Sequence, residues 1–490
     1  MAAKTGNVGF VRKEVKEMLP LYDTVSDCVD GDWKVKQKKE KYLPRPNAED
    51  VTEANLKRYQ AYLTRAIFYN VTRSTFQGLL GQIFTREPQI EVPIELEPLV
   101  KNTNGEGLDL TQFSKVISGG VLKHSRVGIL ADYPKTKSGL SKAEIEAGSI
   151  QPVLKSYKSS DIINWRTETK GSEQILTLVV LKETYIDTDD GFEFTEATQY
   201  RALRLIDGKY NQELYKGERG LFELVDTFIP VDVAGNPFDK IPFTFACASD
   251  NTPIPEVPVL YDIAILNLGH YRNSADYEES CYLVGQPTPY FSGLTEEWVK
   301  SVLNGRIQLG SRAAVPLPAG GDAGLLQAEP NTMPKEAMDH KEAQFLAIGA
   351  KLVTNESAKT ATEARMNNTT ETSILANVAN NVSEAIVGAL KFAEKFVSRT
   401  ESEIIFKLNT DFEISKMSVE ERNQLLQEWM KGGMSFTEYR DNLRKGKIAL
   451  GEDDEAKTEI DEDTQASLEM QGDQFGNGNQ DMKLDKSNVQ

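Results

Sequence analysis

Residues 261–305 read YDIAILNLGHYRNSADYEESCYLVGQPTPYFSGLTEEWVKSVLNG, and this stretch decides the organisation of the chain. Its first half predicts a helix from about residue 260 to 284, which would span about 36 Å. The following insert, up to Met333, is punctuated by Gly and Pro and predicts one short helix around Trp298. Pro334 then fits the first position of a returning helix that runs to about Val353. Taken alone, this order also fits a simple helical hairpin that carries a decoration.

Downstream, TNESAKTATE (354–363) predicts a Thr/Ser/Lys-rich loop before a long helix over roughly Thr362–Leu408. Two shorter helices are predicted after it. One covers Val419–Met430, with Ser418 as its cap and Glu421 in the capping-box position, and the other covers Phe436–Leu443.

Upstream, Asn47 fits the cap of a helix, and apolar residues from Leu56 to Phe84 keep helical spacing. Another helix is predicted over Leu110–His124. From Arg126 to about Pro253 the pattern changes to runs rich in β-branched and aromatic residues. The predicted strands are VGILADY, PVLKSYKSSDIINWR, ILTLVVLKETYI, YRALRLIDGKYNQELY and IPFTFACA.

Asp207-Gly208 lies between two such runs and indicates a hairpin. An antiparallel β region joined to helices predicts an α+β fold rather than a doubly wound sheet.

The net charge of −18 over 490 residues argues against a broad basic face that grips nucleic acid. Half of this charge lies in the last 40 residues, which carry 12 acidic residues and 3 lysines. Such a segment buries too little apolar surface to fold, so residues 451–490 are predicted to be a disordered acidic tail. The remaining chain is only mildly acidic, so its charge does not exclude a protein that lets nucleic acid pass without holding it.

No pattern of catalysis stands out in the sequence. His124, His270 and His340 lie within predicted helices and outside metal-binding motifs, and no phosphate-binding loop or nucleophile elbow occurs. Three cysteines that are far apart support neither a zinc site nor a disulfide framework. No apolar run approaches the roughly 20 residues of a membrane span. We therefore expect no enzyme activity, no cofactor, no metal and no membrane partner.

The order helix, insert, helix, loop and long helix resembles that of portal proteins, the head–tail connectors of tailed bacteriophages. The resemblance is carried by residues 267–305, by GSRAAVPLPAGGDAGLL (310–326) and by the helix before TNESAKTATEARM. Two further stretches are similar, RAIFYNVTRSTFQGLLGQIFTREP (65–88) and MSVEERNQLLQEWMKGGMSFTEYRDNLRKGKI (417–448). The likeness covers roughly residues 50–450 and rests on the order of elements more than on any one motif.

The resemblance implies a helical and antiparallel β wing, a two-helix stem, a small α/β clip, a long wing helix and a helical crown. The implied parts are the wing (1–257), the first stem helix (258–285), the clip (286–333), the second stem helix (334–353), the tunnel loop (354–362), the long wing helix (363–410), the crown (411–450) and the tail (451–490). Some portals end in a long helical barrel, which the acidic tail of this chain does not predict.

The resemblance further implies a ring, usually of twelve subunits, at a capsid vertex of the virion, assembled in the cytoplasm of a bacterial host. Double-stranded DNA would pass through the ring during packaging and ejection. Terminase and then tail adaptors would dock on it, and the major capsid and scaffold proteins would surround it.

By the same resemblance, Lys351, Lys359 and Arg365 at the tunnel loop would touch passing DNA, although ordinary solvent exposure is the simpler explanation for any one of them. The implied clip contacts for terminase or adaptors are Tyr290, Trp298, Arg306 and Arg312. Burial inside the clip is an equal alternative for the two aromatic residues.

Two other classes of protein stay open at this point. One is a capsid adaptor or scaffold protein that forms no DNA conduit. The other is a hydrolase whose carboxylates come together from distant parts of the β region.

Overall fold

The computed structural model describes residues 7–133, 151–218, 220–286, 288–307, 314–327, 331–353, 373–412, 419–445 and 457–458. The chain divides into two compact units, Met1–Asp411 and Phe412–Gln490. None of the helices in the described ranges is both long and apolar enough to cross a lipid bilayer.

Helices before the β region begin at polar caps or at turns. Thr52 and Asn70 cap α3 and α4, and Asp109 and Gln112 form a capping box at the start of α6. These helices are α1 (Lys13–Asp30), α2 (Asp32–Gln37), the 3₁₀ helix η1 (Lys39–Lys41), α3 (Glu53–Arg65), α4 (Val71–Ile83), η2 (Ile94–Leu96), α5 (Glu97–Lys101) and α6 (Leu110–His124).

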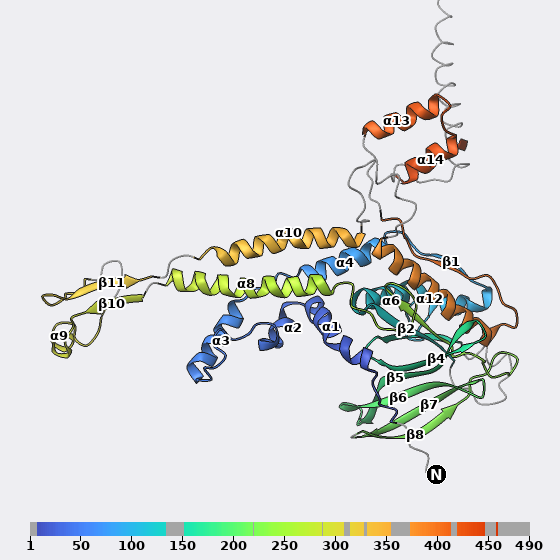
Figure 1. Cartoon of the computed structure of the whole chain (residues 1–490), viewed down its shortest axis with the longest axis horizontal. Helices are drawn as coiled ribbons and strands as arrows, with labels where there is room; N and C mark the ends of the chain where they lie inside the picture. Colours follow the sequence, from blue (N-terminus) through green and yellow to red (C-terminus); the bar gives the residue numbers. More distant parts are fainter. Residues whose placement is uncertain are drawn as a thin grey trace, which may run out of the picture. The chain divides into compact units, whose positions relative to one another are not determined.

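Helices after the β region include the two that bracket the insert. They are α8 (Tyr261–Gly285), α9 (Glu296–Ser301), α10 (Met333–Val353), α12 (Ile374–Val397), α13 (Val419–Met430) and α14 (Phe436–Lys445), labelled in Figure 1.

All strand pairs in the described residues are antiparallel. Four sheets form, in the orders β3-β2-β9, β4-β5-β6-β7-β8, β10-β11 and β1-β12. The strands are β1 (Gln89–Glu91), β2 (Arg126–Asp132), β3 (Val153–Lys158), β4 (Ile162–Lys170), β5 (Glu173–Asp189), β6 (Phe194–Ile206), β7 (Lys209–Glu218), β8 (Leu221–Phe228), β9 (Phe243–Cys247), β10 (Thr288–Ser292), β11 (Asp322–Leu326) and β12 (Ile405–Lys407). Helices and antiparallel sheets together confirm the predicted α+β class.

The core of the first unit forms around β2, in which all seven residues are buried. Helix α12 packs its apolar face on β2 and β9, and α6 packs against α12. Gly128 lies at the centre of β2, where a Cβ atom would come within 2.1 Å of the Phe243 ring. Glycine leaves room at this position for the side chains of Phe243 and Ile162, which pack directly over its Cα.

Arg126 joins β2 to β4, to the turn before β4 and to the segment after β9. It is fully buried, and its guanidinium donates to Ser159 Oγ at 3.0 Å and to backbone oxygens of Pro253, Ser159 and Ile162. The cation also lies over the Trp165 ring, 4.8 Å from its centroid. Because neutral acceptors surround it, burial lowers the Arg126 pKa to about 10.

Several sequence predictions are confirmed. Helix α6 has the predicted bounds, and α8 and α10 agree with the predicted pair to within a few residues. The short helix around Trp298 is α9. Asp207 and Gly208 have φ angles of 50° and 73°, the two left-handed residues of a type I′ turn between β6 and β7.

The predicted helix from Asn47 to Phe84 is wrong, because the chain forms two helices, α3 and α4, with an extended link between them. The N-cap is Thr52, not Asn47. In the link, the backbone N–H of Ile67 donates to Ser274 Oγ and that of Phe68 donates to Asp32 Oδ1. These long-range hydrogen bonds replace the helical ones, which periodicity alone does not reveal.

The long wing helix predicted over 363–410 is also corrected. Ser373 caps α12, and the helix ends at Val397. The chain then turns, and β12 pairs with β1, with Ile90 opposite Phe406. Ile404 and Phe406 are buried in this arrangement. Burial of these alternating apolar residues against a distant strand outweighs their helix-compatible spacing.

Two strand predictions are corrected as well. PVLKSYKSSDIINWR is not one strand but two, β3 and β4, which separate at a turn after Lys158 and enter different sheets. Strand β8 was not predicted from the sequence. Its apolar residues are adjacent rather than alternating, and Leu221, Leu224 and Val225 are exposed at the sheet edge.

The second unit contains α13 and α14, as predicted. The Trp429 ring stacks on Tyr439 with 5.0 Å between ring centroids. Ser435 and Glu438 form reciprocal capping hydrogen bonds at the start of α14. The expected Ser418 cap, the tunnel loop 354–362 and all of the tail except Lys457 and Thr458 lie outside the described residues.

Candidate functional site

The paired helices α8 and α10 lie side by side (Figure 1) and form the centre of the candidate site. One side of α8 is fixed to the N-terminal helices. Asn267 Oδ1 accepts from the backbone N–H and the hydroxyl of Thr72, at 3.1 and 2.9 Å. Asp276 accepts from the Tyr62 hydroxyl at 2.6 Å, and Glu279 binds Arg65. These contacts anchor α8 to α3 and α4.

The other side of α8 contacts α10. Lys341 Nζ donates to Asn273 Oδ1 at 3.3 Å, and His270 Nε2 lies 3.5 Å from Glu342 Oε1. The His270 ring is buried between Tyr69 and Phe345, with ring centroids 5.8 and 6.1 Å away. His270 is therefore a point where α8, α10 and the link after α3 meet.

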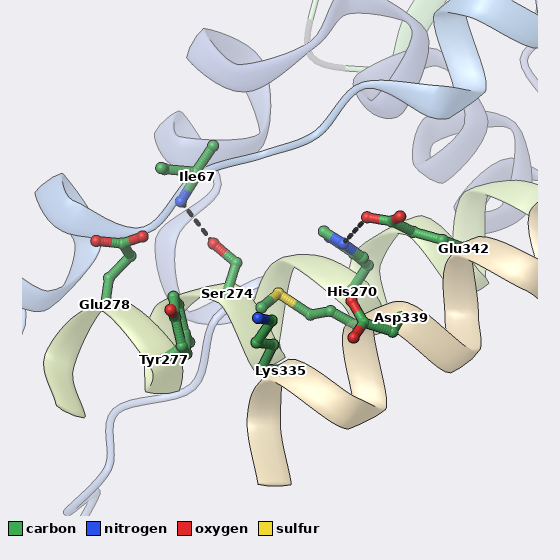
Figure 2. Close-up of a pocket in the computed structure, with 9 residues that line it drawn as sticks. Ile67, His270, Ser274, Tyr277, Glu278, Lys335, Asp339 and Glu342 are labelled. Carbon is green, nitrogen blue, oxygen red and sulfur yellow. Dashed lines mark hydrogen bonds and ion pairs between the residues drawn. The ribbon is translucent and has the colours of Figure 1, made fainter. Parts of the chain in front are cut away.

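A cavity of about 270 Å³ opens beside His270, and Figure 2 shows its walls. Its residues come from α8, from α10 and from the α3–α4 link. They are Ile67, His270, Ser274, Tyr277, Glu278, Lys335, Met338, Asp339 and Glu342.

Burial is the main cause that lowers the His270 pKa, and the positive charge of Lys341 adds to it. The carboxylates of Glu342 and Asp339 act in the opposite direction, but the net direction is downward. The imidazole is therefore neutral at pH 7.

Further from the core, the helix pair loses its packing. The last buried residue of α8 is Ala275, ten residues before its end, and Leu283 is 47% exposed. On α10 the described residues Phe345 and Leu352 are buried, whereas Leu346 is 78% exposed. The distal part of α8 and part of α10 thus expose apolar residues in the single chain.

A second cavity, of about 580 Å³, lies between the same two helices. It is lined by Tyr261, Asp262, Ile265, Leu266, Gln344, Ala347 and Ile348. Ile265 is 46% exposed, so the apolar surface between α8 and α10 is open at this point.

The insert between the helices folds as β10, α9 and β11. Tyr290 lies opposite Gly324 in the two-stranded sheet, and its hydroxyl donates to Asp322 Oδ2 at 3.4 Å. A Cβ atom on Gly324 would lie 2.8 Å from the Tyr290 ring, so glycine lets the ring cover the strand. Trp298 donates from Nε1 to the Pro316 carbonyl at 3.3 Å. Both aromatic residues therefore hold the insert together.

The other predicted site residues are only partly described. Arg306 is exposed at the end of the segment after α9. The backbone of Lys351 lies in the last turn of α10. Arg312, Lys359 and Arg365 lie outside the described residues, so their predicted contacts stay predictions.

The carboxylates of the β region come together in a buried network rather than in an open site. Asp132 accepts from Lys155 at 2.8 Å and from Gln212 at 3.0 Å, and Glu183 binds Arg201 at 2.7 Å. Burial raises the pKa of both carboxyls, but these partners outweigh it and the net direction is downward. A general acid needs a raised pKa, so the network is better explained as structural ion pairing.

Two of the three cysteines, Cys28 and Cys247, are buried, whereas Cys281 is exposed. Burial raises the pKa of the Cys28 and Cys247 thiols to about 12, so neither forms a thiolate at neutral pH. Within these residues, no cluster of three or more His, Cys, Asp or Glu side chains is arranged to hold a metal ion.

Nothing in the sequence singles out His270 as a functional residue. Its position in a predicted helix indicates a structural histidine, and Glu342, whose Oε1 lies 3.5 Å from His270 Nε2, comes 72 positions later on a different helix. Only the pairing of α8 with α10 brings them together. The predicted helix–insert–helix order was the one available signal, because it implies that the two helices run back along each other.

Comparison with known proteins gives one family match. Residues 259–397 match the model of a family described as "Domain of unknown function (DUF4055)". The matched range contains α8, the insert, α10 and α12. No curated protein matches the chain.

Two solved structures are similar to part of the chain. One is described as the neck of an empty GTA particle computed with C6 symmetry, with 14% sequence identity and a TM-score of 0.38, covering 77% of this chain and 90% of that chain. The other is described as the neck of a native GTA particle computed with C12 symmetry, with 14% identity and a TM-score of 0.35, covering 76% and 89%. Both TM-scores are low, so the function proposed below rests on the residues of this chain.

Proposed function

We propose that this chain is the subunit of a portal ring, a structural channel at a capsid vertex through which double-stranded DNA is packaged and ejected. In this proposal α8 and α10 are the stem, residues 286–333 are the clip, and residues 354–362 are the tunnel loop. Terminase and later tail adaptors dock on the ring, and the capsid and scaffold proteins surround it. No catalytic step is assigned to the chain.

The insert carries this proposal, because in its described part no side chain is buried. Leu325 and Leu326 are 64% and 70% exposed, and Val302 is 40% exposed. A two-stranded sheet with one six-residue helix is marginally stable in water by itself. The insert therefore needs a second molecule to complete its core, and neighbouring copies in a ring supply one on each side.

The exposed apolar residues of α8 and α10 also favour contact with a second molecule. A closed ring is built from heterologous contacts, which need two different patches on each subunit. Ile265 on α8 and Leu346 on α10 are exposed apolar residues on two different helices. Copies packed side by side would bury both patches at once.

A channel role also suits the charge. A conduit has to avoid many tight phosphate contacts, since each neutralised phosphate adds affinity and slows sliding. In the proposed ring, Lys351, Lys359 and Arg365 at the tunnel loop are the cations that would touch passing DNA. Tyr290, Trp298, Arg306 and Arg312 are the proposed clip residues for terminase or adaptor contact.

The proposal is tested by the size and shape of the purified protein. We expect mass photometry to show a species of about twelve times the 54.6 kDa chain, and negative-stain images to show rings with a central hole. Leu346→Asp should shift the population to monomers or small oligomers, because it places a charge in the proposed contact. His340→Asp is the matched control, an acid at an exposed polar position of the same helix.

A wild-type chain that stays monomeric at every concentration would refute the ring. An assembly without a central hole would instead favour a capsid adaptor or scaffold protein. If His340→Asp disrupted assembly as strongly as Leu346→Asp, the effect would come from charge on α10 in general rather than from the apolar patch.

A further inference from the structure

The cavity beside His270 has the size of a site for a small ligand or a single side chain. Its volume of about 270 Å³ is just below the roughly 300–1,000 Å³ of common small-molecule pockets. Figure 2 shows that its walls come from both paired helices and from the link that holds Ile67.

His270 and Ser274 are the two buried polar residues of this cavity, and the His270 side chain is 7% exposed. In the described part of the chain neither of its ring nitrogens has a partner in hydrogen-bond geometry, although Nε2 lies 3.5 Å from Glu342. Buried polar atoms without partners are uncommon, because leaving water without compensation costs stability. A neutral imidazole has one nitrogen lone pair, so it can accept a hydrogen bond from a ligand N–H.

The walls around His270 carry an excess of negative charge. Glu278, Asp339 and Glu342 stand against the single cation Lys335, which leaves a net charge of about −2 with the imidazole neutral. No ion pair within 4.0 Å is found among the described residues for Glu278, Asp339 or Lys335. The side chains of Ile67 and Met338 add an apolar wall.

We propose that this cavity binds an ammonium or guanidinium group carried on an aliphatic stem. The cation N–H groups donate to the His270 ring and to the carboxylates of Glu342 and Asp339, and the stem packs on Met338. Hydrogen bonds in which one partner is charged are the stronger class, which makes this pairing selective for cations over neutral amides. The proposal does not depend on ring formation.

The cation has two possible sources with the same chemistry. It is either a diffusible di- or polyamine, or a Lys or Arg side chain from a second copy of the chain. In the first case the site takes ligand from solution, and in the second case it joins neighbouring subunits.

The test is calorimetric titration of the purified full-length protein with agmatine, which has a guanidinium and an ammonium group on a four-carbon chain. We expect saturable binding with one site per chain at pH 8. Glu342→Gln should weaken this binding about tenfold, the usual effect of removing one charged hydrogen-bond partner. Glu342 is half exposed, with 53% side-chain accessibility, so the variant should fold. Glu297→Gln, at an exposed acid of α9 away from the cavity, is the matched control and should bind as the wild type does.

The second arm is an electron-microscopy structure of the assembled protein. A Lys or Arg nitrogen from a neighbouring copy within about 3.2 Å of His270 or Glu342 would support the side-chain source and would explain an absence of agmatine binding. The proposal is overturned if agmatine binds equally to the wild type and to Glu342→Gln. It is also overturned if the wild type does not bind and the cavity holds no cation in the assembly. If the chain binds agmatine but never forms rings, the proposed cation site is supported and the proposed portal function is refuted.

Discussion

At the scale of single residues, His124 shows how burial turns an ionisable group into a structural one. Its ring is 5.3 Å from the Tyr22 ring, and Nε2 lies 2.9 Å from Ser26 Oγ. Burial, followed by the charges of Lys123 and Lys158, lowers the His124 pKa from 6.5 to about 4. The neutral imidazole thus bridges α6 and α1.

This burial predicts a loss of stability in acid. Between pH 6.5 and about 4, the unfolded chain binds a proton that the folded chain refuses, so the stabilisation present above pH 6.5 is lost as pH falls. The full effect is about 3 kcal/mol. His124→Gln keeps a hydrogen-bonding group but cannot titrate. Between pH 7.5 and 5, we expect the Tm of this variant to fall about 2–3 °C less than that of the wild type, measured by differential scanning fluorimetry.

His340→Gln is the control for this pH experiment. His340 is exposed, so its replacement should leave the acid-induced fall in Tm unchanged. His270, whose pKa is also lowered, stays in all three proteins and contributes equally to each. An equal fall in wild type and His124→Gln would mean that His124 accepts its proton in the folded state.

The sequence predicted residues unevenly, for a physical reason. The helical placement of His124, His270 and Trp298 could be predicted from local periodicity. What these side chains touch could not, since the partners Ser26 and Glu342 are distant in sequence. The role of Tyr290 and Trp298 in terminase or adaptor contact stays a prediction, whereas the structure shows that both residues hold the insert together.

At the scale of elements, the β6–β7 hairpin depends on its turn. Gly208 has a φ of +73° and open space where a Cβ would lie, so only the backbone conformation resists substitution. Gly208→Ala should cost about 1–2 kcal/mol. Gly78 lies inside α4, also with open space around it, and Gly78→Ala should stabilise the protein by about 0.5–1 kcal/mol. Chemical denaturation of both variants measures the two effects.

The two variants should change the free energy of unfolding in opposite directions, although both changes add the same methyl group. Destabilisation by Gly78→Ala would show that α4 contacts another molecule at that position. A neutral effect of Gly208→Ala would show that the turn relaxes to another type without loss.

Elements were predictable where local signals agreed and no distant partner intervened. The predicted helix Leu110–His124 agrees with α6, whose start carries the Asp109–Gln112 capping box, and the predicted hairpin at Asp207-Gly208 agrees with the β6–β7 turn. The predictions failed at the link after α3 and at β12, where hydrogen bonds to Ser274 and to β1 decide the backbone. A pattern within one segment carries no information about such partners.

At the scale of the whole molecule, the acidic tail should be dispensable for folding. The segment 452–490 carries half of the net charge and few apolar residues. A chain that ends at residue 451 should keep the Tm of the full chain to within about 2 °C, because little buried surface is lost. Differential scanning fluorimetry and circular dichroism test this expectation, and a large drop in Tm would show that the tail packs on folded parts.

The α+β class and the helix–insert–helix order were predictable for the whole chain, because both depend on patterns longer than one element. The sequence predicts the helices α8 and α10 and the insert between them. It does not predict that the distal parts of these helices and the insert are exposed. Leu346 and Leu325 look like core residues in the sequence, and only the fold shows that the single chain leaves them uncovered.

The pairing of β1 with β12 has a consequence for biosynthesis. Gln89 lies opposite Lys407, so the two strands are separated by more than 300 residues. At about 5–20 residues per second, a ribosome takes roughly 15–60 s to make the intervening chain. Strand β1 therefore leaves the ribosome long before its partner β12. The chain between the two strands, which includes the paired helices and the insert, is synthesised before β1 and β12 can pair. The first unit closes only when its last residues leave the ribosome, and a nascent chain stopped before Ile405 would keep an unpaired β1 edge open to wrong partners.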